Sequence, residues 1–172
     1  KGGTLQDRIR KGPLDIMTVL AIGADLAAAL DHMHAQAILH RDIKPSNIGF
    51  TGEGTPKLLD FGLARFVADV AGASDSQPSA TAEGEFLSSA RVLIGTPAYF
   101  SPELAALGRP DYDADLWALA VTLYEAIGRV NPMVGGPPLE TIEYIKRTPV
   151  PPLDTFRADC PPAVSECFAR LL

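Results

Sequence analysis

The stretch from Asp113 to Gly128 constrains the fold most strongly, because its apolar residues recur at helical spacing and cover most faces of the helix that they predict. A helix of this kind is stable only when other elements surround it. An earlier stretch, residues 13–36, has apolar residues at steps of three and four along one stripe, with Pro13 suited to a first turn. We therefore expect a central helix at 113–128 and a helix at 13–36 that turns one side towards the core.

Between and after these helices the pattern breaks into shorter elements. Residues 48–50 and 57–59 flank a Gly-containing turn signal at 51–54, which predicts a small β-hairpin. Shorter helices are expected at 139–146 and from Pro162 to the end of the chain. Residues 66–94 hold mostly small and polar residues without periodicity, which indicates a long flexible loop. The expected fold class is therefore α+β and mainly α-helical, with one small hairpin.

Composition excludes some partners. The 172 residues include 15 basic and 21 acidic side chains, so the net charge of -6 disfavours a nucleic-acid partner. Acidic residues interrupt the most apolar stretches, 19–30 and 116–127, and both are too short for a membrane segment.

Cys160 and Cys167 have no further cysteine to form a framework, so we expect two buried thiols and a cytoplasmic location. The chain opens at Lys1 without a methionine, which suggests part of a longer protein.

Three motifs carry the chemistry. The first is HRDIKPSN at residues 40–47, between the first long helix and the hairpin, and the second is Asp60-Phe61-Gly62, which begins thirteen residues after Asn47. The third is GTPAYFSPE at residues 95–103. In this order and context they resemble the catalytic loop, the metal-binding motif and the end of the activation segment of protein kinases.

This resemblance implies transfer of the γ-phosphate of ATP, with Mg²⁺, to Ser or Thr hydroxyls of protein substrates. Asp42 would orient the hydroxyl and accept its proton, and Lys44 would place a positive charge beside the transferring phosphate. Asn47 and Asp60 would hold Mg²⁺ through hard oxygen atoms, and Lys44 would join them in binding the nucleotide phosphates. In the family, the position of Thr96 contacts Asp42 and Lys44 near the substrate hydroxyl.

Further residues sharpen the resemblance towards the eukaryotic-type serine/threonine kinases of bacteria. The Lys-Pro pair at 44–45 and the Gly-Thr-Pro at 95–97 are typical of serine/threonine rather than tyrosine kinases. DLWAL at 115–119 matches a family motif on the central helix whose Asp holds the backbone of the catalytic loop. The resemblance therefore implies structural roles for His40, Phe61, Gly62, Glu103, Asp115 and Trp117.

Two of these structural residues carry specific expectations. His40 should be packed in the core, where it would brace the catalytic loop and the region of Phe61, and should not bind metal. Glu103 would normally form a buried ion pair with an arginine late in the domain. Neither Arg157 nor Arg170 lies in the expected sequence context, so this partner is expected to be missing.

Arg41, beside Asp42, implies regulation by phosphorylation, because a phosphate on the loop would pair with its guanidinium. The candidate sites are Ser88 and Ser89, with Thr81 behind them. Arg8-Ile9-Arg10-Lys11 forms a basic cluster that we interpret as a solvated face rather than a docking site. His32 and His34 lie two apart on a helix, hence on different faces, and provide no zinc site.

The sequence has no G-x-G-x-x-G loop, and none of its lysines stands in a V-A-I-K strand. Both features belong to the N-terminal lobe of the family, so residues 1–172 are expected to form the C-terminal lobe only, a partial kinase domain with the N-lobe absent. The first partner implied for these residues is therefore the missing N-terminal lobe of the parent chain. The 172-residue piece alone should be inactive. The alternatives are a pseudokinase-like or docking module and a small-molecule kinase, which should lack the motif at 95–103.

Overall fold

The computed structural model describes residues 2–59, 65–66, 97–107 and 111–172. Helices dominate, accompanied by two small antiparallel sheets, as the α+β prediction anticipated. The α-helices are α1 (Leu5–Lys11), α2 (Ile16–His34), α6 (Pro102–Leu107), α7 (Tyr112–Gly128), α8 (Pro138–Ile145) and α9 (Pro162–Leu171). The strands are β1 (Ile38–Leu39), β2 (Ile48–Phe50), β3 (Pro56–Leu58) and β4 (Arg65–Phe66), and the 3₁₀ turns are η1 (Pro45–Asn47), η4 (Pro97–Tyr99) and η5 (Leu153–Thr155).

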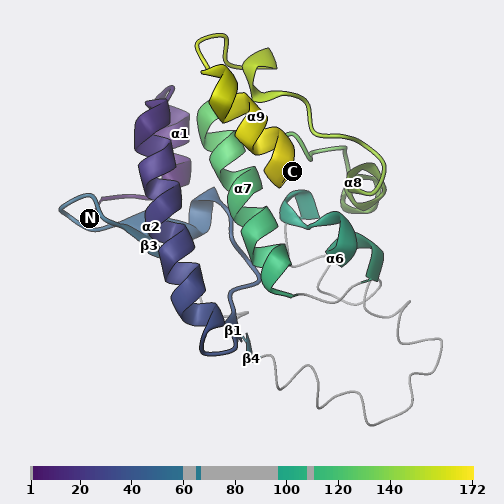
Figure 1. Ribbon diagram of the computed structural model, residues 1–172, viewed down its shortest axis with the longest axis horizontal. Helices are drawn as coiled ribbons and strands as arrows, with labels where there is room; N and C mark the ends of the chain where they lie inside the picture. Colours follow the sequence, from purple (N-terminus) through teal and green to yellow (C-terminus); the bar gives the residue numbers. More distant parts are fainter. Residues whose placement is uncertain (1, 60–64, 67–96, 108–110) are drawn as a thin grey trace.

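Helix α7 is the central element, as predicted, and lies between α2 and α9 (Figure 1). Its Tyr124 and Ile127 are fully buried together with Val19 and Leu30 of α2. Gly23 lets the two helices approach closely, since a Cβ atom there would lie 2.6 Å from Cδ1 of Leu123. Helix α7, which is apolar on most faces, thus covers the apolar stripe along one side of α2.

The long helices begin where an aspartate caps them. Asp15 accepts the N–H of Thr18 at 2.8 Å, so α2 begins at Ile16 rather than at Pro13, the predicted first-turn residue. Asp111 caps α7 in the same way through the N–H of Ala114 at 2.9 Å. In both helices the side-chain acceptor, rather than the apolar period, decides the first residue.

Helix α1 was not predicted. Thr4 and Asp7 form a capping box in which each side chain binds the other residue's backbone N–H. Leu5 and Ile9, one helical turn apart, are buried. Arg8 of the basic cluster lies over the ring of Phe50, 3.2 Å from its centroid, so the cluster is only partly a solvated face.

The predicted hairpin is present as β2 and β3, paired from Ile48 with Leu58 to Phe50 with Pro56. The N-terminal segment extends it, because the N–H of Gly2 donates to the carbonyl of Phe50. The second sheet was not predicted: β1 pairs with β4, and Ile38 lies opposite Phe66. Phe66 is the first residue of the predicted loop 66–94, and residues 67–94 lie outside the described part.

Burial differs from the sequence-based expectation at one of the two cysteines. Cys160 is buried, but Cys167 is exposed, because α9 turns Phe168 inward and Cys167 outward. Helix α2, with a mean hydropathy of 1.4, meets the length and composition of a membrane span. Core helices of globular domains meet the same criterion, and α2 packs on α7 through one stripe of buried residues.

Candidate active site

The predicted catalytic residues of the HRDIKPSN segment converge on the carboxylate of Asp42. Lys44 Nζ lies 2.9 Å from Oδ1 of Asp42, and Asn47 Nδ2 donates to Oδ2 at 2.7 Å. The Asp42 and Lys44 side chains are 18% and 20% exposed, so both groups are held in place and still reach solvent. A carboxylate oriented from both sides in this way can accept a proton from a hydroxyl that lies within hydrogen-bond distance of it.

The amide of Asn47 has a defined orientation. Its nitrogen also donates to the backbone carbonyl of Asp42 at 2.8 Å, and both partners are acceptors, so Nδ2 must face Asp42. The amide oxygen therefore points elsewhere and receives no hydrogen bond from the described residues. A neutral, hard oxygen is a type of ligand that Mg²⁺ accepts, so the chemistry of Asn47 is compatible with the cation that the sequence implies.

Asp60, the second predicted magnesium ligand, lies outside the described residues. Its neighbour Leu59 donates its backbone N–H to the carbonyl of Asn47 at 2.8 Å. Leu59 therefore lies directly beside Asn47. Within the described residues no group of three or more His, Cys, Asp or Glu side chains is arranged for a metal ion.

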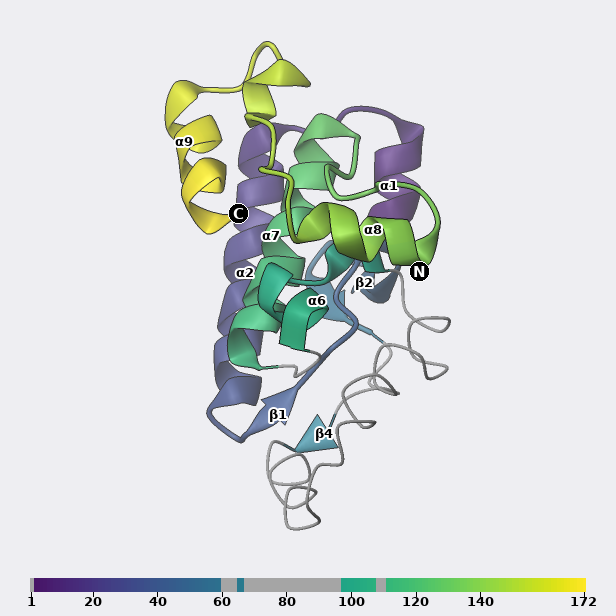
Figure 2. The same cartoon turned by 90° about the vertical axis from the view of Figure 1, so that its right-hand side faces the viewer.

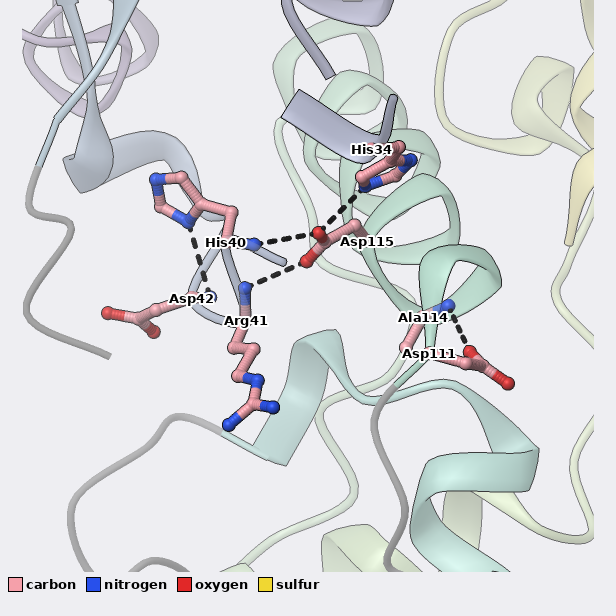
Figure 3. Close-up of polar contacts among 7 residues, drawn as sticks. All are labelled: His34, His40, Arg41, Asp42, Asp111, Ala114 and Asp115. Carbon is pink, nitrogen blue, oxygen red and sulfur yellow. Dashed lines mark hydrogen bonds and ion pairs between the residues drawn. The ribbon is translucent and has the colours of Figure 1, made fainter. Parts of the chain in front are cut away.

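Asp115 joins α7 to the catalytic loop, which is the contact implied by the resemblance (Figure 3). Its Oδ2 accepts the backbone N–H of His40 at 2.8 Å, and its Oδ1 accepts that of Arg41 at 2.8 Å. Asp115 is 2% exposed. Arg41 has a φ of 68°, in the left-handed region that non-glycine residues seldom occupy, so this anchor holds a strained backbone.

His40 is fully buried and braces the loop from inside. Its Nε2 donates to the carbonyl of Leu59 at 3.1 Å, while Nδ1 accepts the N–H of Asp42 at 3.4 Å. One ring nitrogen therefore donates and the other accepts, as in a neutral imidazole. Through these bonds His40 ties Asp42 to the strand end that precedes Asp60.

His34 is a site residue that sequence reasoning did not find. Its Nε2 lies 3.0 Å from Oδ2 of Asp115 (Figure 3). Its ring lies 4.7 Å from that of Tyr112. It supplies a third donor to the carboxylate that holds the catalytic loop. The two partners are 81 residues apart, and no local pattern signals their contact.

Other predicted residues lie apart from this centre. Glu103 is exposed on α6, and Arg157 pairs with Asp159 at 2.6 Å instead. Trp117 packs half-buried against the apolar cluster to which η4, α6 and α8 contribute. Figure 2 shows α6 and α8 in front of α7. The remaining predicted site residues lie outside the described part of the chain: Phe61, Gly62, Thr81, Ser88, Ser89 and Thr96.

Comparison with known proteins matches residues 1–166 to the protein kinase domain. The probable serine/threonine-protein kinase CPE1738 of Clostridium perfringens is 36% identical over 154 residues, which are 88% of this chain and 20% of that protein. The serine/threonine-protein kinase PknB of Mycolicibacterium smegmatis is 33% identical over 173 residues, 99% of this chain and 25% of that protein. The chain thus spans about a fifth to a quarter of the length of these curated relatives.

Proposed function

The chain belongs to the protein kinase domain family, in its bacterial serine/threonine branch, and on that premise we propose that it transfers the γ-phosphate of ATP to Ser or Thr hydroxyls of proteins. The observation that carries the proposal is the Asp42 carboxylate, held between the Lys44 ammonium and the Asn47 amide. A docking module has no need for a carboxylate arranged in this way.

In the proposed reaction, a bond forms between the substrate hydroxyl oxygen and the γ-phosphorus, while the bond from that phosphorus to the β–γ bridging oxygen breaks. Asp42 accepts the hydroxyl proton, and ADP leaves. Lys44, 2.9 Å from Asp42, places its charge where the γ-phosphate oxygens would lie. Mg²⁺, held by the Asn47 amide oxygen and by Asp60, would neutralise phosphate charge.

We propose further that the described chain corresponds to the C-terminal lobe of the kinase domain and needs an N-terminal lobe in the parent chain for ATP binding. The absence of a glycine-rich phosphate loop and of a V-A-I-K lysine from the sequence supports this division. The 172-residue chain alone should therefore show no ATP turnover. Turnover by the isolated chain that Asp42→Asn abolishes would contradict the division.

The catalytic proposal is tested by Asp42→Asn in the full-length parent protein, with phosphate transfer from radiolabelled ATP as the readout. The substitution should lower the rate by about 10²–10⁴-fold if Asp42 orients the hydroxyl and accepts its proton. Asp113→Asn, which neutralises an exposed carboxylate on α7, is the matched control and should keep wild-type activity. Equal activity of Asp42→Asn and wild type would favour a pseudokinase-like or docking module.

Regulation is proposed through Arg41, whose guanidinium would pair with a phosphate on Ser88, Ser89 or Thr81. Mass spectrometry of the parent protein, produced with active enzyme and with the Asp42→Asn variant, identifies any phosphate on these residues. An unmodified loop in fully active enzyme would rule out this regulation.

A further inference from the structure

The buried carboxylate of Asp115 holds the catalytic loop through two backbone N–H groups, and its third partner is a histidine side chain. Within the described residues, His34 is the side chain within ion-pair distance of Asp115, with Nε2 3.0 Å from Oδ2. The side chain of Arg41 points away from this carboxylate, although its backbone N–H is bonded to it (Figure 3). Among these residues, a positive charge beside the anchor therefore depends on the protonation of His34.

His34 can exchange a proton with solvent in its folded position. Its side chain is 13% exposed, whereas that of Asp115 is 3% exposed. Histidine is the side chain type that ordinarily changes its charge between pH 5 and 8. In the neutral Nε2–H tautomer the ring donates a hydrogen bond to Asp115, and protonation turns the same contact into a mostly buried ion pair. The ring of Tyr112, 4.7 Å away, is a second group that attracts a cation.

Other titratable groups on the surrounding elements have partners of their own or face solvent. On the catalytic loop, the ring of His40 is bonded to the carbonyl of Leu59, and the carboxylate of Asp42 is bonded to Lys44. On α7 one further carboxylate caps the helix and another is exposed, and on α2 an exposed carboxylate and an exposed histidine lie near His34 in sequence. These groups are Asp111 and Asp113 on α7, and Asp31 and His32 on α2.

The strength of the anchor matters because the backbone that it holds is strained. Arg41 has a φ of 68°, a conformation that costs free energy in any residue other than glycine. Its N–H is held at 2.8 Å by Oδ1 of Asp115, and Asp42 is the next residue along the chain. A weaker anchor would let Arg41 leave the left-handed region, and the carboxylate of Asp42 would move with it.

We propose that His34 and Asp115 form a pH-dependent anchor, in which protonation of His34 tightens the hold of α7 on the catalytic loop and deprotonation loosens it. The anchor itself requires no kinase activity, whereas its consequence for phosphate transfer rests on the proposed function. His34 is then a positioning residue that acts on Asp42 through Asp115. Below neutral pH, the wild-type enzyme should gain over a variant that has a neutral donor at position 34.

The first experiment is an NMR titration of the 172-residue chain between pH 5 and 8, with labelled histidine rings and backbone nitrogens. The chain has three histidines, so three ring signals are followed. We expect the ring of His34 to titrate in this interval, and the backbone N–H signals of His40 and Arg41 to shift with the same midpoint. In His34→Gln, the shift with that midpoint should disappear from both N–H signals.

The wild-type titration decides the anchor even if His34→Gln fails to fold, because it compares two midpoints within one protein. A His34 ring that keeps one protonation state from pH 5 to 8 would overturn the proposal. The same holds if the N–H signals of His40 and Arg41 do not follow the ring.

The second experiment measures the kcat of the full-length parent kinase at pH 6 and at pH 8. The ratio of the wild-type kcat to that of His34→Gln should be about 3–10-fold larger at pH 6, because the imidazolium adds a charge to the hydrogen bond. His32→Gln is the matched control, since it removes an exposed histidine that is bonded to Gln36 on another face of α2. Its ratio should be the same at both pH values.

Equal ratios for His34→Gln at pH 6 and pH 8, or an equal rise for His32→Gln, would overturn the effect of the anchor on catalysis. Failure of the proposed function is recognised separately. In that case the wild-type parent protein transfers no phosphate at either pH, and the NMR titration alone decides whether the anchor responds to pH.

Discussion

Oδ2 of Asp115 lies 2.8 Å from the backbone nitrogen of His40 and so joins the central helix to the catalytic loop across 75 residues of sequence. The other carboxylate oxygen holds Arg41, whose backbone is in the left-handed region. The loop thus keeps an unfavourable local conformation because a buried charge on α7 stabilises it. The geometry of Asp42, the next residue, depends on that anchor.

Asp115→Asn should destabilise the chain by about 2–4 kcal/mol, because one of the two backbone N–H groups would then face an amide N–H₂ instead of a carboxylate oxygen. Urea denaturation of the 172-residue chain measures the change. Asp113→Asn, on an exposed position two residues earlier on α7, is the control and should lower the free energy of unfolding by less than about 1 kcal/mol, the contribution of a first-turn carboxylate to the helix dipole. Equal stability of the two variants would show that Asp115 does not anchor the loop.

Lys44→Met should lower the kcat of the full-length kinase by about 10²-fold, because it removes the charge next to Asp42 that would stabilise the transferring phosphate. Lys44→Arg should restore part of the rate. The exposed Lys57 of β3 offers the control Lys57→Met, with kcat expected at the wild-type value. A wild-type kcat in Lys44→Met would show that Lys44 has no role in the reaction.

Gly23→Leu should destabilise the chain by about 1–3 kcal/mol, because the space for its side chain at the α2–α7 contact is already filled by Leu123. Ala24→Leu adds a leucine at the next, exposed position of α2 and should have little effect. Urea denaturation of both variants makes the comparison. If Gly23→Leu were as stable as Ala24→Leu, α2 and α7 could move apart to accommodate the leucine without any loss in the free energy of unfolding.

The cap of α2 should make stability depend on pH. Hydrogen bonds from the backbone N–H and hydroxyl of Thr18 lower the pKa of Asp15 below its ordinary value of 3.8. A group whose folded-state pKa is lowered stabilises the fold above its unfolded pKa, and this contribution is lost as the pH falls through the folded pKa. Asp15→Asn keeps a neutral cap, so the stability difference between wild type and variant should shrink as the pH falls below 3.8. A difference that is constant with pH, measured by thermal unfolding, would contradict this assignment.

Much of the fold could be predicted because its signals are local. The apolar period identified α2 and α7, and the turn at 51–54 between two apolar runs identified the β2–β3 hairpin. The site residues Asp42, Lys44 and Asn47 lie within eight consecutive positions, so one motif named all three. Helix α1 was not predicted, because seven residues are too few to show a clear helical period of apolar residues. Its stability comes from the Thr4–Asp7 capping box.

The sequence by itself predicted which residues would carry the chemistry and determined which two long helices pack in the core, because motif order and apolar spacing are properties of neighbouring residues. Only the tertiary structure decided how those residues are held. The bonds from Asp115 to His34 and His40, and from Glu125 to Tyr99, join positions 26 to 81 residues apart. Apolar spacing indicates which side of a helix is buried, but a polar side chain finds its partner only when the packed elements bring the two within hydrogen-bond distance.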